Sequence, residues 1–340
     1  MDINKNYKLS ICIPTYNRSS TVEYLLNNII FQLDQANLWD QVQICISDNC
    51  SSDDTYEMVE RFKQRYPIVY SRHSENLGAD RNYLNVIAIA SGEYCWFFGS
   101  DDRFEDGAII KIMQYLEKVN PRVAGISVNC QDYSTDFSHK LSCSYSIFAK
   151  EELNTTENIY ITLGGYLGYV SGNIIKKKYW DEVIKTYDVS NYYNAYVHVY
   201  IIAQMIKKYP LWNYISERLI GWRADNDSFL ERDEKGALFI KRMRLDYAYI
   251  KIANDVFGKD SQIYKHHLNN ICNSHFYGHL LRIKVAGNVN IWPLFPEIGK
   301  MFWQCSSFYS KLLPVFLVPR FALIGIRSII RFARKHGMKV

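Results

Sequence analysis

The chain has 340 residues, of which 48% are hydrophobic and 22% charged, and its net charge is +5. This length accommodates two domains, or one large domain with an appendage, and the composition is ordinary for a globular protein with a buried core. The eight cysteines form no C-x-x-C pair, which argues against a zinc site or a disulfide framework and indicates reduced thiols.

The first hundred residues alternate apolar strands, expected at 9–13, 42–46, 68–70 and 94–98, with helices between them. This alternation predicts a parallel sheet with right-handed crossovers, so that the loops after the strands meet at one edge. Each polar residue there could be an ordinary cap or turn residue, but four polar loops at one edge indicate a site. The residues expected to converge are Thr15, Asn17, Asp48, Arg81, Asp101 and Asp102.

The strand at 94–98 is followed by Gly99, Ser100, Asp101 and Asp102. Two adjacent carboxylates repel each other, so they need a cation, a donor or water to remain ionised. A divalent hard cation bound by oxygen ligands, partly from substrate phosphates, would satisfy them. A solvated acidic turn is the alternative. We also expect Asp102 to be exposed, so that its replacement leaves the fold intact.

Beyond Asp102 we expect a helix at 108–119, a strand at 123–128, a surface loop at 129–140 and a helix at 151–163. The glycines between Gly164 and Gly168 either allow a ligand to approach the backbone or shape a turn. A strand is expected at 173–175 and another at 219–222. Arg223 follows the latter, where it could bind a diphosphate bidentately or belong to a capped loop.

Four motifs in this order resemble the family 2 glycosyltransferases: 11–18 (ICIPTYNR), 46–53 (ISDNCSSD), 76–82 (NLGADRN), and 91–94 (SGEY) with 100–102 (SDD). The resemblance implies the glycosyltransferase A fold, an α/β domain with a mostly parallel sheet that binds a nucleotide diphosphate sugar. The expected catalytic domain spans 1–230, with a nucleotide-binding half at 1–105 and an acceptor half at 106–230. A helical region at 231–340 would follow.

By resemblance, Thr15 and Asp48 contact the base or ribose, Arg81 contacts the phosphates, and Asp101 and Asp102 serve ribose and metal. The metal would be Mg²⁺ or Mn²⁺, held by Asp101 and Asp102. Many relatives have Asp where this chain has Gly99, which leaves open which carboxylate binds the metal. The implied nucleotide-sugar-binding residues are Pro14, Thr15, Asn17, Arg18, Asp48, Asn76, Arg81, Ser100, Asp101 and Arg223.

Many relatives place an acidic pair, whose Asp is the general base, in the region that corresponds to 192–200. No such pair is present here, and His198 stands close to that position. Its unperturbed pKa of about 6.5 suits a base near neutrality, although a histidine among apolar residues can equally be structural. Asp225 and Asp227 in the following loop are competing candidates.

After Asp260 the sequence predicts helices only. The apolar segment 312–330 is interrupted by Pro314, Pro319, Arg320 and Arg327, and the chain has no Asp or Glu after Lys300. An uninterrupted span of about 20 apolar residues is needed to cross a bilayer. The segment is instead typical of a basic amphipathic end that lies on anionic lipid, or of a helix packed on the catalytic domain.

The narrower pattern, at 198–199, 223–229 and 248–256, is most similar to abequosyltransferases of O-antigen assembly. It implies transfer of a dideoxyhexose such as abequose, from its CDP form, to a lipid-linked (polyprenyl diphosphate) oligosaccharide. The polar N-terminus lacks a signal-peptide core, so we expect a cytoplasmic enzyme, peripheral on the inner face of the membrane, with no nucleic-acid partner. The alternatives are a nucleotidyltransferase acting on sugar phosphates, which should have a Gly- and Lys-rich loop after the first strand, or a non-catalytic nucleotide-sugar binding protein.

Overall fold

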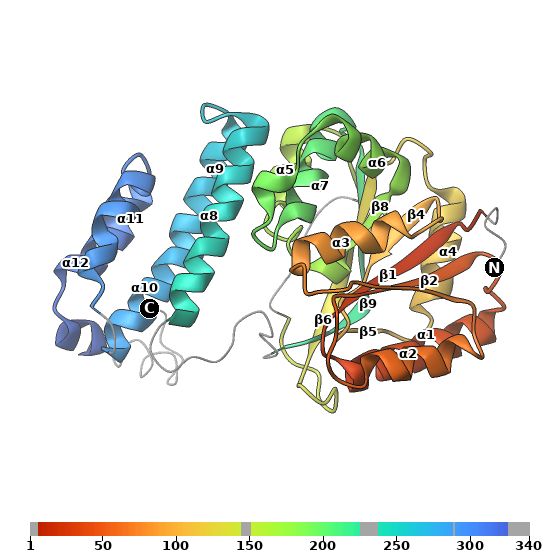
Figure 1. The fold of residues 1–340 in the computed structure, drawn as a ribbon. Coiled ribbons are helices and arrows are strands. Elements are labelled where there is room, and N and C mark those ends of the chain that lie inside the picture. The colour runs from red at the N-terminus through yellow and green to blue at the C-terminus, as the bar shows by residue number, and fades with distance from the viewer. Residues whose placement is uncertain (1–5, 144–150, 225–236, 288–289, 326–340) are drawn as a thin grey trace. The chain divides into compact units, whose positions relative to one another are not determined.

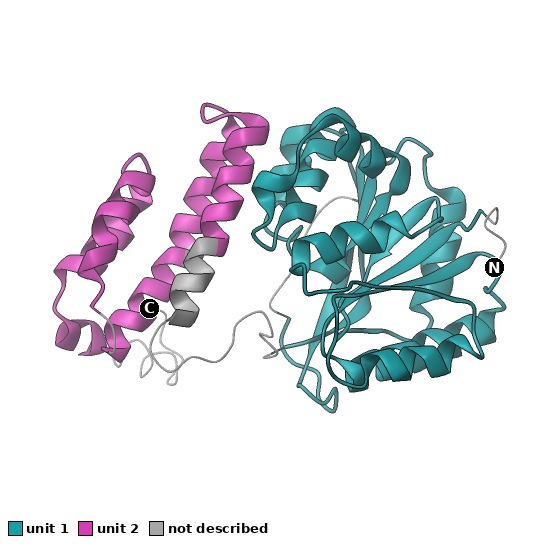
Figure 2. Ribbon diagram, in the orientation of Figure 1, with its two compact units in different colours: residues 1–226 teal, residues 227–340 magenta. Residues whose placement is uncertain are grey.

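The computed structural model describes residues 6–143, 151–224, 237–287 and 290–325 (Figure 1). The chain divides into two compact units, Met1–Asn226 and Asp227–Val340 (Figure 2). The first unit is an α/β domain built on one sheet, and the second unit is helical.

In the described part of the first unit, nine strands form one sheet in the order β3-β2-β1-β4-β8-β6-β9-β5, with β7 paired to β9. The strands β3, β2, β1 and β4 are mutually parallel, whereas β8 runs antiparallel to both β4 and β6. The strands are β1 (Leu9–Thr15), β2 (Val42–Asp48), β3 (Ile68–Arg72), β4 (Tyr94–Phe97), β5 (Arg103–Phe104), β6 (Gly125–Tyr133), β7 (Glu152–Leu153), β8 (Asn173–Lys176) and β9 (Trp212–Arg223).

Helices cover both faces of this sheet (Figure 1). α1 and α4 pack on one face, while α3 contacts β1 and β2, and α6 contacts β8, on the other. The helices are α1 (Ser19–Ala36), α2 (Thr55–Lys63), α3 (Ala79–Ala88), α4 (Ala108–Lys118), α5 (Thr156–Leu163), α6 (Lys177–Thr186) and α7 (Val197–Lys208), with the short 3-10 turns η1 (Val170–Gly172) and η2 (Ser190–Tyr192).

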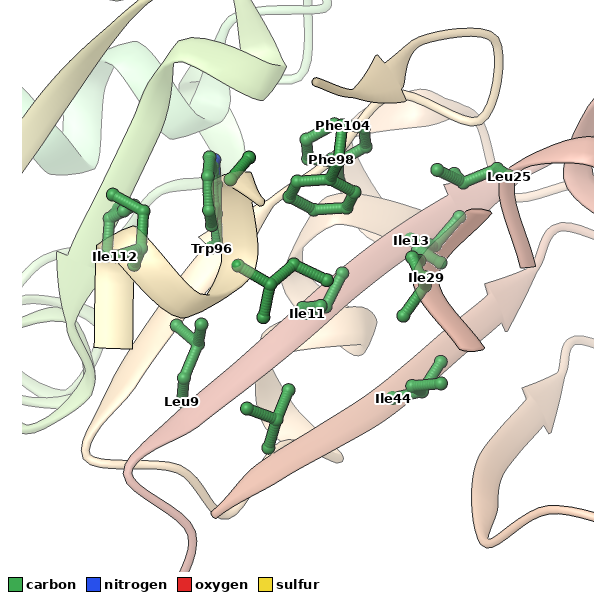
Figure 3. Close-up of a cluster of buried hydrophobic side chains, with 14 of the residues drawn as sticks. Leu9, Ile11, Ile13, Leu25, Ile29, Ile44, Trp96, Phe98, Phe104 and Ile112 are labelled. Atoms are coloured by element: carbon green, nitrogen blue, oxygen red, sulfur yellow. The ribbon is translucent and has the colours of Figure 1, made fainter. Parts of the chain in front are cut away.

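The main core lies between the sheet and the helices α1 and α4 (Figure 3). Successive side chains of a strand point to opposite faces, so Ile11 and Ile13 of β1 share this side of the sheet. Trp96 and Phe98 extend the cluster, and Phe98 stacks on Phe104 with ring centroids 3.8 Å apart. Burial of this apolar surface fixes the strands, and with them the loops at their carboxyl ends.

The structure confirms the predicted α/β class with a mostly parallel sheet. The prediction of a surface loop over 129–140 is wrong for its first part, because β6 continues to Tyr133. Asn129 and Gln131 are buried polar residues there, and each is hydrogen-bonded: Asn129 donates to the carbonyl of Ser216, and Gln131 accepts from Arg218. In the sequence these polar residues resemble those of a loop, because their hydrogen-bond partners belong to another strand.

The second unit is entirely helical in its described part, as predicted. Among the helices in the described ranges, none combines the length and apolar character that a membrane-spanning helix needs. Its elements are α8 (Ala237–Phe257), α9 (Gln262–Asn270), the π-helical η3 (Ile271–Phe276), α10 (Tyr277–Ala286), η4 (Trp292–Leu294), α11 (Phe295–Phe302), η5 (Phe308–Leu312) and α12 (Leu313–Leu317).

Candidate active site

The carboxyl ends of β1 and β2 lie side by side, with Pro14 opposite Ser47 and Thr15 opposite Asp48. Thr15 is 3% exposed, and its hydroxyl oxygen is buried without a hydrogen-bond partner among the described residues. An unsatisfied buried hydroxyl costs free energy, so it is suited to a ligand that supplies the missing hydrogen bond.

Asp48 at the end of β2 is fully buried, and both of its carboxylate oxygens have protein partners. Oδ1 accepts from the backbone N–H of Ser51 at 2.8 Å and from its hydroxyl at 2.6 Å. Oδ2 accepts from the Tyr70 hydroxyl at 2.7 Å and lies 3.5 Å from Nε of Arg72. In this arrangement Asp48 organises the loop after β2.

Asparagine side chains join the loops to one another. Asn17, with a positive φ of 51°, accepts from the backbone N–H of Ser52 at 2.7 Å. Asn49 donates to Oδ1 of Asn76 at 2.7 Å, and Gly78, with φ 84°, then begins α3. The loops after β1, β2 and β3 thus form one hydrogen-bonded rim. It lies at the edge of the sheet where the sequence predicts a ligand site.

Asp101 lies between two arginines at the end of β4. Nη1 of Arg18 is 2.7 Å from Oδ2 of Asp101, an ion pair whose two side chains are each about one fifth exposed. Arg223, at the end of β9, donates from Nε to the backbone carbonyl of Asp101 at 3.1 Å. Segments more than eighty residues apart in the chain therefore meet at this point.

Asp102 is buried, which corrects the expectation of an exposed carboxylate. Its Oδ2 accepts from the hydroxyls of Tyr169 at 3.0 Å and Ser171 at 2.5 Å. Burial, followed by repulsion from Asp101, raises the pKa of Asp102 to about 7, although the Ser171, Tyr169 and Arg223 donors oppose the change. Replacing Asp102 would therefore disturb a buried hydrogen-bonded group as well as the site.

Gly99 has little room for a side chain. A Cβ there would lie 3.1 Å from Oδ2 of Asp102 and 3.1 Å from Oγ of Ser171, so these neighbours would have to shift to admit a third carboxylate. Within the described ranges no group of three or more His, Cys, Asp or Glu side chains is arranged to hold a metal ion. From the protein, a cation at this edge would draw on the Asp101 and Asp102 pair.

The start of α3 contacts the segment between η2 and α7. The guanidinium carbon of Arg81 lies 5.5 Å from the ring centroid of Tyr193. The neighbouring Asp80, 7% exposed, accepts from the backbone N–H groups of Ala195 at 2.7 Å and Val197 at 2.9 Å. Because it is buried, the pKa of Asp80 is raised, although the two N–H donors oppose the change.

His198, the first candidate for the general base, is 1% exposed and lies among aromatic rings. Its ring centroid is 5.1 Å from that of Tyr83 and 6.2 Å from that of Phe97. Burial lowers the pKa of His198 to about 4, opposed by the nearby carbonyls of Gly168 and Leu167. This environment favours a packing role. The competing candidates for the general base, Asp225 and Asp227, lie outside the described residues. Ser100, expected to bind the nucleotide sugar, is buried beside Asp101.

Three residues at the site gave no distinct signal in the sequence: Tyr169 and Ser171, which donate to Asp102, and Asp80. The glycine-rich segment before Tyr169 was the nearest indication, and its two interpretations did not include a hydroxyl donor. Asp80 lies inside the third motif but resembles an ordinary acidic residue in the first turn of a helix.

Known proteins are similar to this chain in sequence and in fold. The family model "Glycosyl transferase family 2" matches residues 10–184. The chain is 36% identical over 268 residues to the abequosyltransferase RfbV of Salmonella typhimurium, covering 74% of this chain and 76% of that protein. It is 31% identical over 125 residues to the GalNAc(5)-diNAcBac-PP-undecaprenol beta-1,3-glucosyltransferase of Campylobacter jejuni, covering 36% of this chain and 38% of that protein.

The fold is similar to the solved structure of S. aureus TarS 1–349 in complex with UDP. The TM-score is 0.59 at 15% sequence identity, with 88% of this chain and 81% of that chain covered. The order of the strands, the motifs at their carboxyl ends and these similarities all indicate the same family and the same fold. The chain belongs to glycosyltransferase family 2 and has the glycosyltransferase A fold.

Proposed function

We propose that this glycosyltransferase moves a sugar from a nucleotide diphosphate sugar to a lipid-linked, polyprenyl diphosphate oligosaccharide in O-antigen or surface polysaccharide assembly. The relative that spans three quarters of both chains transfers abequose, according to its name. A dideoxyhexose such as abequose, carried on CDP, is therefore the first donor to test.

The arrangement around Asp101 carries the nucleotide part of this proposal. Arg18 and Arg223 bring two positive charges to the end of β4, and Thr15 offers an unsatisfied hydroxyl at the end of β1. Arginine binds phosphate groups bidentately, and preorganised charges stabilise a departing diphosphate. Arg81, at the start of α3, adds a further cation to the same rim.

Asp101 and Asp102 fit a divalent cation such as Mg²⁺ or Mn²⁺. They supply only oxygen ligands. Burial and then repulsion from Asp101 raise the pKa of Asp102, and a bound cation would relieve that repulsion. Such an ion, when bound, would neutralise negative charge on the nucleotide diphosphate. Arg18 would hold the Asp101 carboxylate in place through its ion pair.

For the general base we now favour Asp225 or Asp227 over His198. Both aspartates follow β9 in the sequence, and the last residue of β9, Arg223, has its backbone N–H 3.4 Å from Oδ1 of Asp102. His198, by contrast, lies in an aromatic environment and is uncharged at neutral pH.

Association with a membrane surface is proposed for the second unit. Several of its large apolar side chains are exposed, and aromatic residues of this kind are suited to the lipid–water interface. They are Trp292, Trp303, Tyr309, Leu317, Phe321 and Ile324.

A panel of CDP-, UDP- and GDP-sugars, each incubated with the protein with and without Mn²⁺, tests the activity by release of the nucleoside diphosphate. We expect one nucleotide class to be cleaved, and Asp101→Asn to lower the rate by at least a hundredfold. Asp106→Asn is the matched control, because Asp106 is an exposed carboxylate in the same loop region. Equal rates for Asp101→Asn and the wild type would contradict the assignment of the site.

A further inference from the structure

A tight hairpin turn follows β6, closed by the pairing of Tyr133 with Lys140. The backbone N–H of Ser134 donates to the carbonyl of His139 at 2.9 Å. Within the turn, Oδ1 of Asp136 accepts from the hydroxyls of Ser134 and Ser138, each at 2.6 Å. These bonds hold the backbone of the turn through its small polar residues.

Phe137 occupies the tip of this turn with a φ of 60°. Only Gly, Asn and Asp adopt this left-handed region readily, and a bulky side chain there strains the backbone. Strain of this kind persists only where the surrounding structure over-determines the backbone, and it is common at ligand-binding and active sites. The hydrogen bonds within the turn do not require a phenylalanine at position 137. The reason for this residue therefore lies in the contacts of its ring.

The Phe137 ring contacts two arginines. The guanidinium carbon of Arg223 lies 4.7 Å from its centroid, and that of Arg103 lies 4.8 Å from it. Tyr24 of α1 stacks on the same ring, with centroids 5.7 Å apart and an interplanar angle of 11°. Both guanidinium contacts fall within the range of a cation–π interaction.

The Arg223 side chain is fixed at Nε, whereas its terminal nitrogens have no partner among the described residues. Its Nε donates to the carbonyl of Asp101, and its backbone N–H approaches Asp102. Among the described residues its two terminal nitrogens have no hydrogen-bond or ion-pair partner. A fixed guanidinium with unpaired donors, beside the carboxylate pair, is suited to a phosphate group.

We propose that Phe137 is a positioning residue, whose ring holds the Arg223 guanidinium in the orientation that binds the diphosphate of the donor nucleotide. The proposal rests on the proposed role of Arg223 in nucleotide binding. Phe137 would act on the β-phosphate through Arg223 and would leave the recognition of base and ribose unchanged.

Calorimetry tests this with nucleoside diphosphate and monophosphate pairs in Mn²⁺ buffer, using whichever of CDP, UDP and GDP binds the wild type most tightly. Phe137→Gly removes the ring and suits the left-handed backbone, so the turn should fold; Phe137→Leu keeps apolar bulk without the π face. We expect both variants to bind the diphosphate about five- to tenfold more weakly and the monophosphate within about twofold of the wild type.

Two further variants distinguish a wrong assignment of Phe137 from a wrong assignment of Arg223. Arg223→Ala should weaken diphosphate binding at least as much as Phe137→Gly. Tyr24→Leu, which removes the ring stacked on Phe137 and a hydrogen bond from Arg103 but leaves Phe137 in place, should have a smaller effect. If Arg223→Ala weakens the diphosphate but the Phe137 variants do not, Phe137 has no positioning role. Equal losses for diphosphate and monophosphate would also overturn it. If Arg223→Ala binds both ligands normally, the proposed role of Arg223 fails, and the inference fails with it.

Discussion

Three titratable side chains of the first unit, Asp102, Asp80 and His198, are buried for two different reasons. Asp102 and Asp80 are buried as hydrogen-bond acceptors, with two hydroxyls and two backbone N–H groups as their respective donors. His198 is buried instead against Tyr83 and Phe97. A buried imidazole resists protonation, so this residue should affect stability in acid more than it affects catalysis.

We expect His198 to make the protein more sensitive to acid. Below pH 6.5 the unfolded chain binds a proton at this histidine, whereas the folded protein binds it only near its pKa of about 4. Stability therefore falls as the pH is lowered through this interval, by about 3 kcal/mol from this residue. Urea denaturation of the wild type and of His198→Leu at pH 7, 5.5 and 4 would show the wild type losing that much more.

A parallel decline of the two proteins would contradict this account of His198. Turnover measured per folded molecule gives an independent check, since a packing residue should leave it nearly unchanged. A loss of about 10²–10⁴-fold in His198→Leu would instead restore the histidine as the general base.

At the level of elements, the start of α3 joins the two halves of the catalytic unit. The preceding turn binds Asn49 at the end of β2 through Asn76 and Leu77. Asp80, one turn further, holds the backbone that leads into α7. Ala195 in that segment has a φ of 78°, which this pair of hydrogen bonds helps to maintain. The helix thus fixes the segment before α7 relative to the loop after β2.

Asp80→Ala should loosen that segment. Hydrogen bonds to a charged acceptor contribute about 1.5–3 kcal/mol, so amide exchange at Ala195 and Val197 should accelerate roughly ten- to two-hundredfold where local opening limits it. Hydrogen–deuterium exchange of a peptide covering 190–200 measures the change. Asp188→Ala is the control, because among the described residues the exposed Asp188 accepts from Ser190 alone, which precedes the stretch from Ala195 to Val197. Unaltered exchange in Asp80→Ala would show that other contacts hold the loop.

At the scale of the whole molecule, the second unit carries large apolar side chains that are exposed. The second unit has Trp303 56% exposed and Phe321 78% exposed. Some of the basic residues near the end of the chain have local partners: Arg320 donates to the carbonyls of Val285 and Ala286 at the end of α10. Apolar contact should therefore contribute to membrane binding beside charge attraction, which salt screens over about 8–10 Å.

Replacing both Trp303 and Phe321 by Ser should reduce sedimentation with anionic vesicles, even at low salt. The wild type should be released only partly by high salt, because burial of apolar side chains in the interface is not screened. Phe31→Ser is the matched control, since Phe31 is 58% exposed on α1 of the first unit. Equal pelleting of all three proteins would contradict a lipid-binding role for these aromatic residues.

The local sequence determined much of this protein. Apolar runs such as Leu9–Ile13 and Tyr94–Phe98 predicted buried strands because a strand covered on both faces has no polar side. The alternation with helices then required parallel connections, and the motifs after the strands identified the family and predicted a site at one edge of the sheet. These inferences depend on short-range pattern and on chain topology, which a sequence displays directly.

Only the tertiary structure decided which polar groups are buried and what they contact. Asp102 is paired with hydroxyls from residues 169 and 171, and Arg223 with a carbonyl of residue 101 and a ring of residue 137. Likewise, the polar end of β6 is a strand because Ser216 and Arg218 satisfy it. The free energy of a polar side chain depends on partners that the fold brings from distant segments, and those partners leave no mark on the residues beside it in the sequence.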